Sequence, residues 1–187
     1  SDTTMESYAA QIKKKADECL KDGITEYVLS NGRLLEQCET VQNRICYMSM
    51  AYLLSDDEVI KNTYAEKIWE EVYNVCVTWS DWNPYHFLDT GTMAYSVSIA
   101  YDWLYDYWSN ERRTIMEEAL YNRGVMTIVD DLLSKERERK NNWLDFENNW
   151  SFVCIGGVAC AALAIADIDK YSDNCMLANS FHRMMQT

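Results

Sequence analysis

The stretch 79–89 combines large aromatic side chains with amide, carboxylate and imidazole groups. Its members of these kinds are Trp79, Asp81, Trp82, Asn83, Tyr85, His86, Phe87 and Asp89. Sugars bind proteins through flat aromatic surfaces with a few polar partners, so this composition indicates a carbohydrate-binding loop. Histidine exchanges protons near neutral pH, which makes His86 a candidate acid or base. The alternative is that these rings only fix the loop to the domain.

A second polar segment carries the sequence Asn-Asn-Trp twice, at 141–143 and 148–150. In the second copy, Asn148 and Asn149 stand directly before Trp150. Two neighbouring amides can hydrogen-bond a carboxylate while the indole stacks on the sugar ring. The glycine pair 156–157 lies in the apolar helix expected over about 152–166, and it predicts a close approach by a neighbouring helix.

A carboxylate also occurs on an apolar helix, at Asp102 between Tyr101 and Trp103. A buried carboxylate must be paired or hydrogen-bonded. We therefore expect Asp102 to be either a buried structural partner of a neighbouring loop or a ligand contact in a groove, with Trp103 beside it.

Long helices must position these groups, because the chain has one proline and six glycines, too few for a turn-rich β fold. Leu34, Cys38, Val41, Ile45, Met48 and Tyr52 recur at helical spacing. We expect helices over about 3–22, 34–54, 57–75, 89–108, 109–124, 125–135 and 152–166, and a last one from a cap at Ser172 to the C-terminus. Asp89 or Thr90 is the expected cap of the fourth helix, and Ser109 that of the fifth. The expected fold class is all-α, built from antiparallel helical hairpins.

The charge and the cysteines exclude several classes of function. Thirty acidic and seventeen basic residues give a net charge of −13, which disfavours nucleic acid and anionic membranes as partners. The same charge is awkward for a protein that binds acidic polymers. The seven cysteines are odd in number and include no CxxC pair, so neither a disulfide framework nor a zinc ribbon is indicated. We expect no cofactor and no metal.

Three of these segments together resemble the heparinase II/III-like polysaccharide lyases, in their N-terminal α/α toroid. The matching stretches are Trp82-Asn83-Pro84 with Phe87-Leu88-Asp89-Thr90, then Ser98 to Tyr105 around Tyr101-Asp102-Trp103, and finally Asn148-Asn149-Trp150 to Gly156-Gly157. Their order and spacing agree over about residues 33–187. The resemblance implies that residues 1–187 form a single all-α domain, part of an incomplete toroid at the N-terminus of a larger enzyme with a β-sheet domain.

The family cleaves polysaccharides that contain uronic acid by β-elimination. The resemblance implies that Asn149 or Asn148 neutralises the substrate carboxylate. It also implies that Trp82, Asn83, Tyr85, His86, Asp102, Trp103 and Trp150 contribute to binding the acidic polysaccharide. The family's tyrosine and second histidine are expected in a later segment, so we expect this chain alone to be inactive as a lyase. Relatives with a histidine after the asparagine differ from this chain, which has Trp150 there. Family members are usually exported, which implies a periplasmic or secreted protein.

Two other functions are open on the residues alone. An α/α-barrel glycoside hydrolase needs two carboxylates that flank the cleaved bond, and Asp81, Asp89, Asp102, Asp145 and Glu147 are candidates. This alternative accounts better for the acidic composition. A helical scaffold that binds a glycan or a protein without turnover is the third possibility.

Overall fold

The protein is all-α. The computed structural model describes residues 3–133 and 149–176, and every regular element in these ranges is a helix. The first three helices are α1 (Thr3–Cys19), α2 (Leu35–Leu53) and α3 (Glu58–Tyr73). A short π-helical segment, η1 (Asn74–Thr78), extends α3.

The second half begins with α4 (Phe87–Trp103) and α5 (Asn110–Ala119). The helical path of α5 continues through a π-helical segment, η2 (Leu120–Val125), into α6 (Met126–Leu133). The last long helix is α7 (Asn149–Ala164). Within residues 3–133 and 149–176, no helix is both long enough and apolar enough to cross a lipid bilayer.

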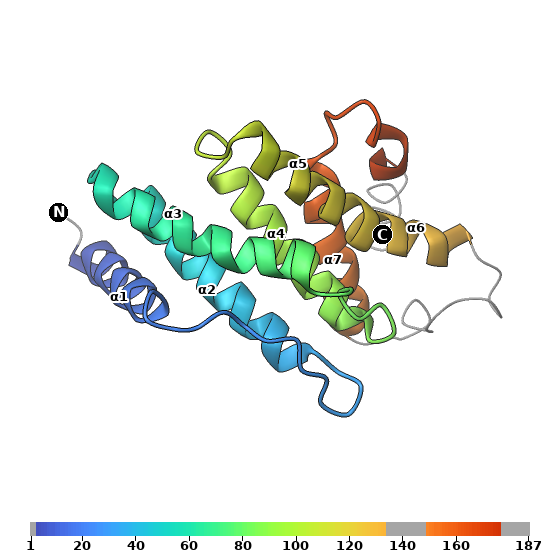
Figure 1. Cartoon of the computed structure of the whole chain (residues 1–187), viewed down its shortest axis with the longest axis horizontal. Coiled ribbons are helices and arrows are strands. Elements are labelled where there is room, and N and C mark those ends of the chain that lie inside the picture. Colours follow the sequence, from blue (N-terminus) through green and yellow to red (C-terminus); the bar gives the residue numbers. More distant parts are fainter. Residues whose placement is uncertain (1–2, 134–148, 177–187) are drawn as a thin grey trace.

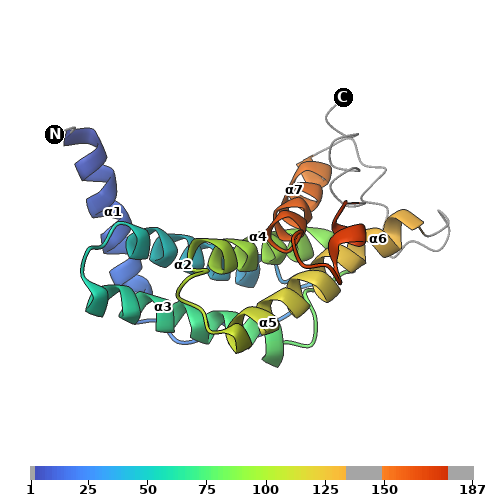
Figure 2. The same cartoon turned by 90° about the horizontal axis from the view of Figure 1, so that it is seen from above.

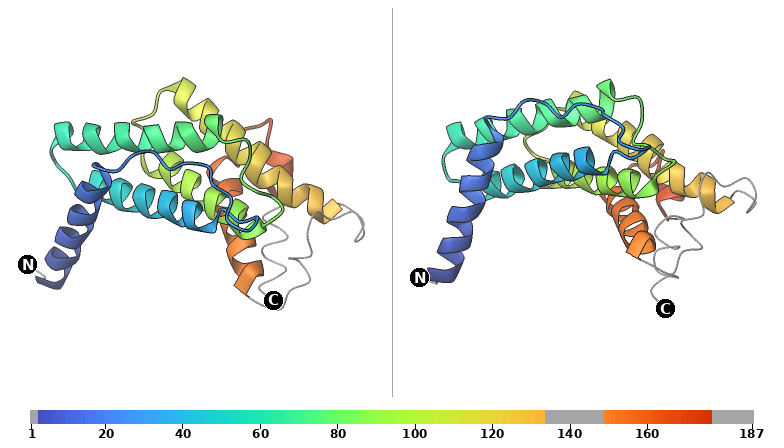
Figure 3. Two further views of the ribbon diagram at one scale, coloured as in Figure 1. Left: turned by 60° about the horizontal axis from the view of Figure 1, so that its bottom comes forward. Right: turned by 90° about the horizontal axis from the view of Figure 1, so that it is seen from below.

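The helices are arranged around a central layer in which α2 and α4 lie side by side (Figure 1). α3 covers one face of this layer together with α5 and η2, and α6 extends onward from η2. α1 and α7 project from the other face (Figures 2 and 3). α2 and α3 form one antiparallel hairpin, and α4 and α5 form the next (Figure 1). The expected hairpin architecture is therefore confirmed.

The buried face of α2 matches the expected stripe. Leu34, Cys38, Val41, Ile45 and Met48 are all completely buried. Because these positions recur every three or four residues, they lie along one side of the helix and pack into a single core with the other helices. The helix periodicity of the sequence therefore predicted this face correctly.

Two expected helix starts are confirmed by their caps. The Asp57 side chain accepts hydrogen bonds from the backbone N–H groups of Val59 and Ile60 at the start of α3. The Ser109 hydroxyl accepts one from the N–H of Arg112 at the start of α5. Each cap satisfies donors that have no partner inside the helix.

Both expected ends of α4 and the expected helix end at Gly124 were wrong. α4 begins at Phe87 rather than at a cap formed by Asp89 or Thr90, and it ends at Trp103 rather than Trp108. Trp108 belongs to the following turn, where its indole N–H donates to the Ala100 carbonyl. Gly124 does not end a helix, because it lies buried in the continuous run from α5 to α6.

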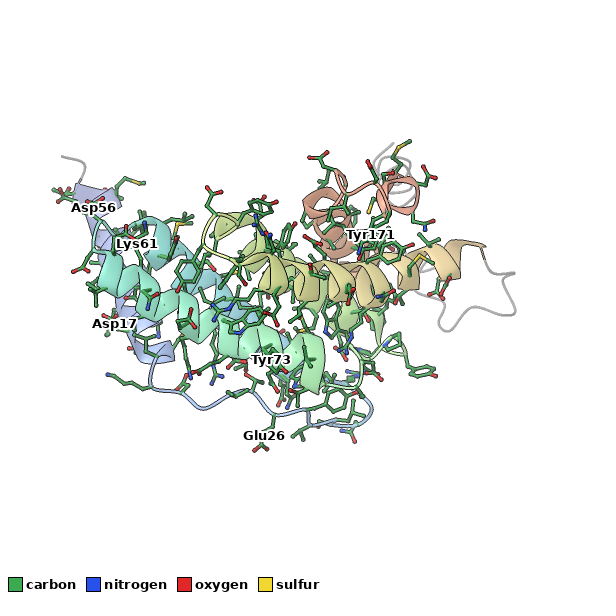
Figure 4. The ribbon with its side chains drawn as sticks, turned by 45° about the horizontal axis from the view of Figure 1, so that its top comes forward. Asp17, Glu26, Asp56, Lys61, Tyr73 and Tyr171 are labelled. Carbon is green, nitrogen blue, oxygen red and sulfur yellow. The ribbon has the colours of Figure 1, made fainter. Side chains whose placement is uncertain are left out.

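α7 begins at Asn149, three residues before the expected start, so Asn149 and Trp150 occupy its first turn. After α7, the chain turns back towards η2, and Tyr171 lies beside that segment (Figure 4). The Tyr171 ring stacks on that of Tyr121 with centroids 4.3 Å apart. This contact fixes the described end of the chain against the α5–α6 side of the molecule.

α4 and α7 pack so closely that their backbones touch. A Cβ atom on Gly157 would lie 1.9 Å from the carbonyl oxygen of Gly91, and a Cβ on Gly91 would lie 2.8 Å from the Cα of Cys154. Glycine is therefore required on both helices at this crossing. The close approach expected from the glycine pair 156–157 is confirmed for Gly157 alone, because a Cβ on Gly156 meets no atom within 4 Å.

Candidate functional site

The amino-terminal ends of α2, α4 and α7 meet at one end of the molecule (Figures 1 and 3). The backbone N–H of Leu34, which immediately precedes α2, donates to the carboxylate of Asp89 in the first turn of α4 at 2.7 Å. His86, immediately before α4, contacts Trp150 in the first turn of α7, with ring centroids 4.9 Å apart. The two loops singled out by their composition are thereby brought together.

The loop 79–86 is held in place by its own side chains. Trp82 is 1% exposed, and its indole N–H donates to the carbonyl of Val75 at 2.9 Å. The hydroxyl of Thr90 donates to the Trp82 carbonyl. Asp81 accepts hydrogen bonds from the backbone N–H of Asn83 and from the hydroxyl of Tyr27, both at 2.8 Å. The loop is therefore a rigid support for the side chains that follow it.

Asp89 is the centre of a buried polar cluster that we call the Asp89 cluster, comprising Asn83, His86 and Asp89. The Asp89 side chain is completely buried. Its Oδ2 atom accepts hydrogen bonds from Leu34 N–H and from Asn83 Nδ2 at 2.8 Å, and its Oδ1 lies 2.8 Å from His86 Nδ1. These contacts compensate for burying a carboxylate, which is costly when it has no partners.

Both the backbone conformation and the side-chain hydrogen bonds of Asn83 suit its position in this cluster. Its backbone φ is +49°, in the left-handed region that asparagine tolerates better than most residues. Its side-chain amide donates to the carbonyl of Gly32 as well as to Asp89. Gly32 and Asn31 both have positive φ, as the two central residues of a type I′ turn require. Asn83 therefore links the 30–33 turn to the start of α4.

The surface over the Asp89 cluster is partly open. The His86 side chain retains 10% of its exposure, and Trp150 is half-buried against it. Asn149 is exposed, and so are Tyr85 at 73% and Phe152 at 74%. An imidazole, an indole, a free amide and two exposed aromatic rings therefore lie on or beside the joined ends of α4 and α7.

The amino terminus of α7 differs from the acidic chain as a whole in its local charge. Aligned peptide dipoles place partial positive charge at a helix amino terminus. α7 has no acidic residue in its first turn, so this partial charge is not offset there. The carboxylate of Asp89 is stabilised by hydrogen bonds from Leu34 N–H and Asn83 Nδ2. The −13 net charge is thus compatible with a locally favourable place for an anion.

The surroundings of the two thiols next to the cluster disfavour their reactive thiolate form. Burial, and secondarily the charge of Asp89, raises the pKa of the Cys154 thiol to about 12. The same causes raise the pKa of the Cys38 thiol well above its usual value. Both cysteines are buried and unpaired. Because the thiolate is the reactive form, these residues serve packing.

The structure does not bring every sequence-predicted residue to this site. Trp82 lies in the core and offers no face to a ligand in this conformation. The expectation that Asp102 is buried was wrong, because it is exposed near the carboxyl end of α4, with the half-buried Trp103 next to it. At a rise of about 1.5 Å per residue, Asp102 lies about 20 Å along α4 from Asp89.

Asp102 instead lines a separate groove between α4 and α7. This groove has a volume of about 230 Å³, and its other lining residues are Ser98, Ile99, Cys160, Leu163 and Ala164. Asp102 therefore lies in a groove, but its distance along α4 separates it from the Asp89 cluster.

Asn148, Asp145 and Glu147 lie outside the described residues. Among the described carboxylates considered for hydrolysis, Asp81 and Asp89 are both engaged in hydrogen bonds to the protein. In residues 3–133 and 149–176, no group of three or more histidine, cysteine or acidic side chains is placed to hold a metal ion.

The sequence analysis considered Asp89 as a polar group of the carbohydrate-binding loop, as a helix cap and as a hydrolytic carboxylate, but not as the centre of a buried cluster. Asn83, His86 and Asp89 recur at intervals of three residues. That spacing could have indicated that their side chains gather on one side of a helix start. The donor from Leu34 could not have been found in this way, because it lies 55 residues away in the chain.

A scan against models of known protein families and a search of curated protein sequences each gave no match.

Proposed function

We propose that this chain is the helical, glycan-binding part of a polysaccharide lyase that cleaves uronic-acid-containing polysaccharide by β-elimination. The observation that carries the proposal is the contact of His86 with Trp150, which follows Asn149 at the amino-terminal end of α7. The motif resemblance supplies the reaction class. The proposed architecture for the whole enzyme is an α/α toroid, to which the observed hairpins contribute a part.

The chemistry of β-elimination explains why such a site is useful. The proton to be removed lies next to a carboxylate, whose negative charge opposes formation of the enolate. Neutral donors that hydrogen-bond this carboxylate stabilise the charge that develops. Asn149 offers an exposed amide in the first turn of α7, a helix without acidic residues there. We assign carboxylate neutralisation to Asn149, with Asn148 as a second candidate.

The other side chains divide into contacts and supports. Tyr85 and Trp150 are the aromatic surfaces on which we place sugar rings, and His86 is a polar contact between them. We assign Asn83 a supporting role, because its side chain hydrogen-bonds Asp89, which in turn contacts His86. Because Asp102 and Trp103 lie towards the other end of α4, we assign them to a more distant part of a long polymer rather than to the cleaved bond.

We expect the proton-transfer residues to come from the remainder of a parent enzyme, which would complete the cleft. The 187-residue chain should then bind uronate oligosaccharides without cleaving them. Unsaturated uronide, seen as ultraviolet absorbance after incubation with a panel of uronate polymers, would contradict this assignment of the proton-transfer residues.

The test of the proposal is calorimetric titration with uronate oligosaccharides and with neutral oligosaccharides of the same length. The informative variant is Asn149→Asp, because a carboxylate in the first turn of α7 favours the helix but repels a bound uronate. We expect stability to be kept or slightly raised and uronate affinity to fall by at least about tenfold, which corresponds to about 1.4 kcal/mol. The matched control is Asn122→Asp on η2, which adds the same charge at another exposed asparagine.

Equal affinity for neutral and uronate sugars would favour a general glycan-binding scaffold. Reducing ends produced without unsaturation would favour a hydrolase. Uronate binding that is unaffected by Asn149→Asp would remove Asn149 from the site.

A further inference from the structure

We propose that Asp89 holds His86 as the tautomer with its proton on Nδ1, so that Nε2 presents a lone pair that accepts a hydrogen bond from a hydroxyl group of the bound sugar. Only the identity of the ligand rests on the function proposed above. The tautomer itself follows from the hydrogen bonds of the Asp89 cluster.

The first step is the direction of the bond between the two residues. Oδ1 of Asp89 lies 2.8 Å from Nδ1 of His86. An ionised carboxylate only accepts hydrogen bonds, and Asp89 already accepts two on Oδ2, from Leu34 N–H and Asn83 Nδ2. Nδ1 must therefore carry the proton. In the neutral imidazole this leaves Nε2 as an acceptor.

The second step concerns whether Nε2 of His86 is available to a ligand and how the imidazole ring is oriented. Among residues 3–133 and 149–176, no group hydrogen-bonds to this nitrogen, and the ring keeps 10% of its exposure. The ring is oriented by Asp89 on one side and by the edge-on contact with Trp150, at an interplanar angle of 83°, on another. The imidazole is thus fixed before a ligand arrives, which lowers the entropy lost on binding.

The two halves of the site then differ in chemistry. Asn149 and the amino terminus of α7 offer hydrogen-bond donors, which suit a carboxylate. His86 offers an acceptor, which suits a hydroxyl group and disfavours an anion. A uronic acid ring carries both groups, so the pair would select a hydroxylated, carboxylated sugar and its orientation.

The variant Asp89→Asn gives a specific test because the cluster dictates how the new amide must lie. Two donors, Leu34 N–H and Asn83 Nδ2, point at the position of Oδ2, so the amide oxygen must occupy it. The amide nitrogen then faces Nδ1 of His86 and donates to it. The imidazole is forced into the opposite tautomer, with its proton on Nε2 and no acceptor towards the ligand.

The experiment is a long-range proton–nitrogen NMR correlation spectrum of the nitrogen-labelled chain at alkaline pH, which distinguishes the two neutral tautomers. The chain has two histidines, so the His86 signals are assigned with His86→Gln. We expect the Nδ1–H tautomer in the wild type and the Nε2–H tautomer in Asp89→Asn. The matched control is Asp102→Asn, the same change at an exposed position of α4, which should leave the tautomer unchanged.

An Nε2–H tautomer of His86 in the wild type would overturn the proposal. The wild-type spectrum therefore tests the proposal even if Asp89→Asn does not fold. Retention of the Nδ1–H form in a folded Asp89→Asn chain would overturn it as well. The binding arm uses a uronate oligosaccharide, and we expect Asp89→Asn to lower its affinity about tenfold through the lost acceptor. Unchanged affinity with an inverted tautomer would refute the ligand contact. Absence of binding by the wild type would instead refute the proposed function, and the spectra would still decide on the tautomer.

Discussion

Gly156 and Gly157 are neighbours in α7 with different surroundings, so the same substitution at each should have opposite effects on stability. A Cβ on Gly157 would lie 1.9 Å from the carbonyl oxygen of Gly91, whereas a Cβ on Gly156 meets nothing within 4 Å. Gly156→Ala should therefore report only the backbone effect of alanine in a helix. Gly157→Ala adds a collision with the backbone of α4.

The size of the collision follows from these distances. To move the Gly91 oxygen from 1.9 Å to even 3.0 Å, α4 and α7 must separate by about 1.1 Å. A gap of this size removes about a quarter to a half of the dispersion energy of each contact across it. The α4–α7 pair is the most extensive helix pair among the described residues. We expect Gly157→Ala to lower the free energy of unfolding by at least about 3 kcal/mol. Gly156→Ala should raise it by about 0.5–1 kcal/mol.

The assay is urea unfolding of both variants and the wild type, followed by tryptophan fluorescence and circular dichroism. Because a domain of this kind is stable by only about 5–15 kcal/mol, complete unfolding of Gly157→Ala also agrees with the prediction. A free energy of unfolding for Gly157→Ala within about 1 kcal/mol of the wild-type value would refute the backbone contact. Equal losses in both variants would show that helix–helix packing does not distinguish the two positions.

Three further predictions concern the rest of the fold. Glu71 is completely buried and pairs with Arg44, so Glu71→Gln should destabilise the protein by about 3 kcal/mol in urea unfolding, because it leaves the Arg44 charge without its buried partner. The control is Asp22→Asn, which removes the exposed partner of Arg44 and should cost under about 1 kcal/mol. Equal losses of unfolding free energy in the two variants would contradict the role of Glu71 as the buried partner of Arg44. The hydrogen bond from Arg112 lowers the pKa of Glu66 in the folded protein. The ionised Glu66 therefore stabilises the fold at pH values above its unfolded-state pKa, and this stabilisation is lost as the pH falls through the lower folded-state pKa. Glu66→Gln should therefore show a smaller loss of stability on acidification than the wild type in unfolding curves measured across acidic pH, and an unchanged slope would contradict this. Asp57→Ala should cost about 1 kcal/mol in thermal unfolding by removing the cap of α3, whereas no change would show that the cap is replaceable.

Much of the fold could be predicted because helical signals are local. The stripe from Leu34 to Met48, the caps Asp57 and Ser109 and the turn at Asn31-Gly32 depend on residues a few positions apart. The errors arose where a distant partner overrides the local signal. Gly124 would end an isolated helix, but here a Cβ on it would lie 3.4 Å from the Cβ of Ala94, so its small size serves packing.

The candidate site could be predicted only in part. The loops 79–89 and 148–150 were identified by composition, and Asn149, Tyr85 and His86 are accessible, wholly or in part, at one end of the molecule. Asp102 was misjudged because an apolar helix face does not reveal whether another helix covers it. Among the described residues, Asp102 is exposed at the groove between α4 and α7.

The sequence by itself determined that this protein is helical and where most helices lie. These properties depend on backbone hydrogen bonds and on periodic side chains within a few turns. Only the tertiary structure decided that Asp89 is buried while Asp102 is exposed, and that His86 meets Trp150. The physical reason is the crossing of Gly91 and Gly157, where two backbones touch because neither carries a side chain. That contact sets the distance between α4 and α7, and no local pattern in either helix specifies which partner it will meet.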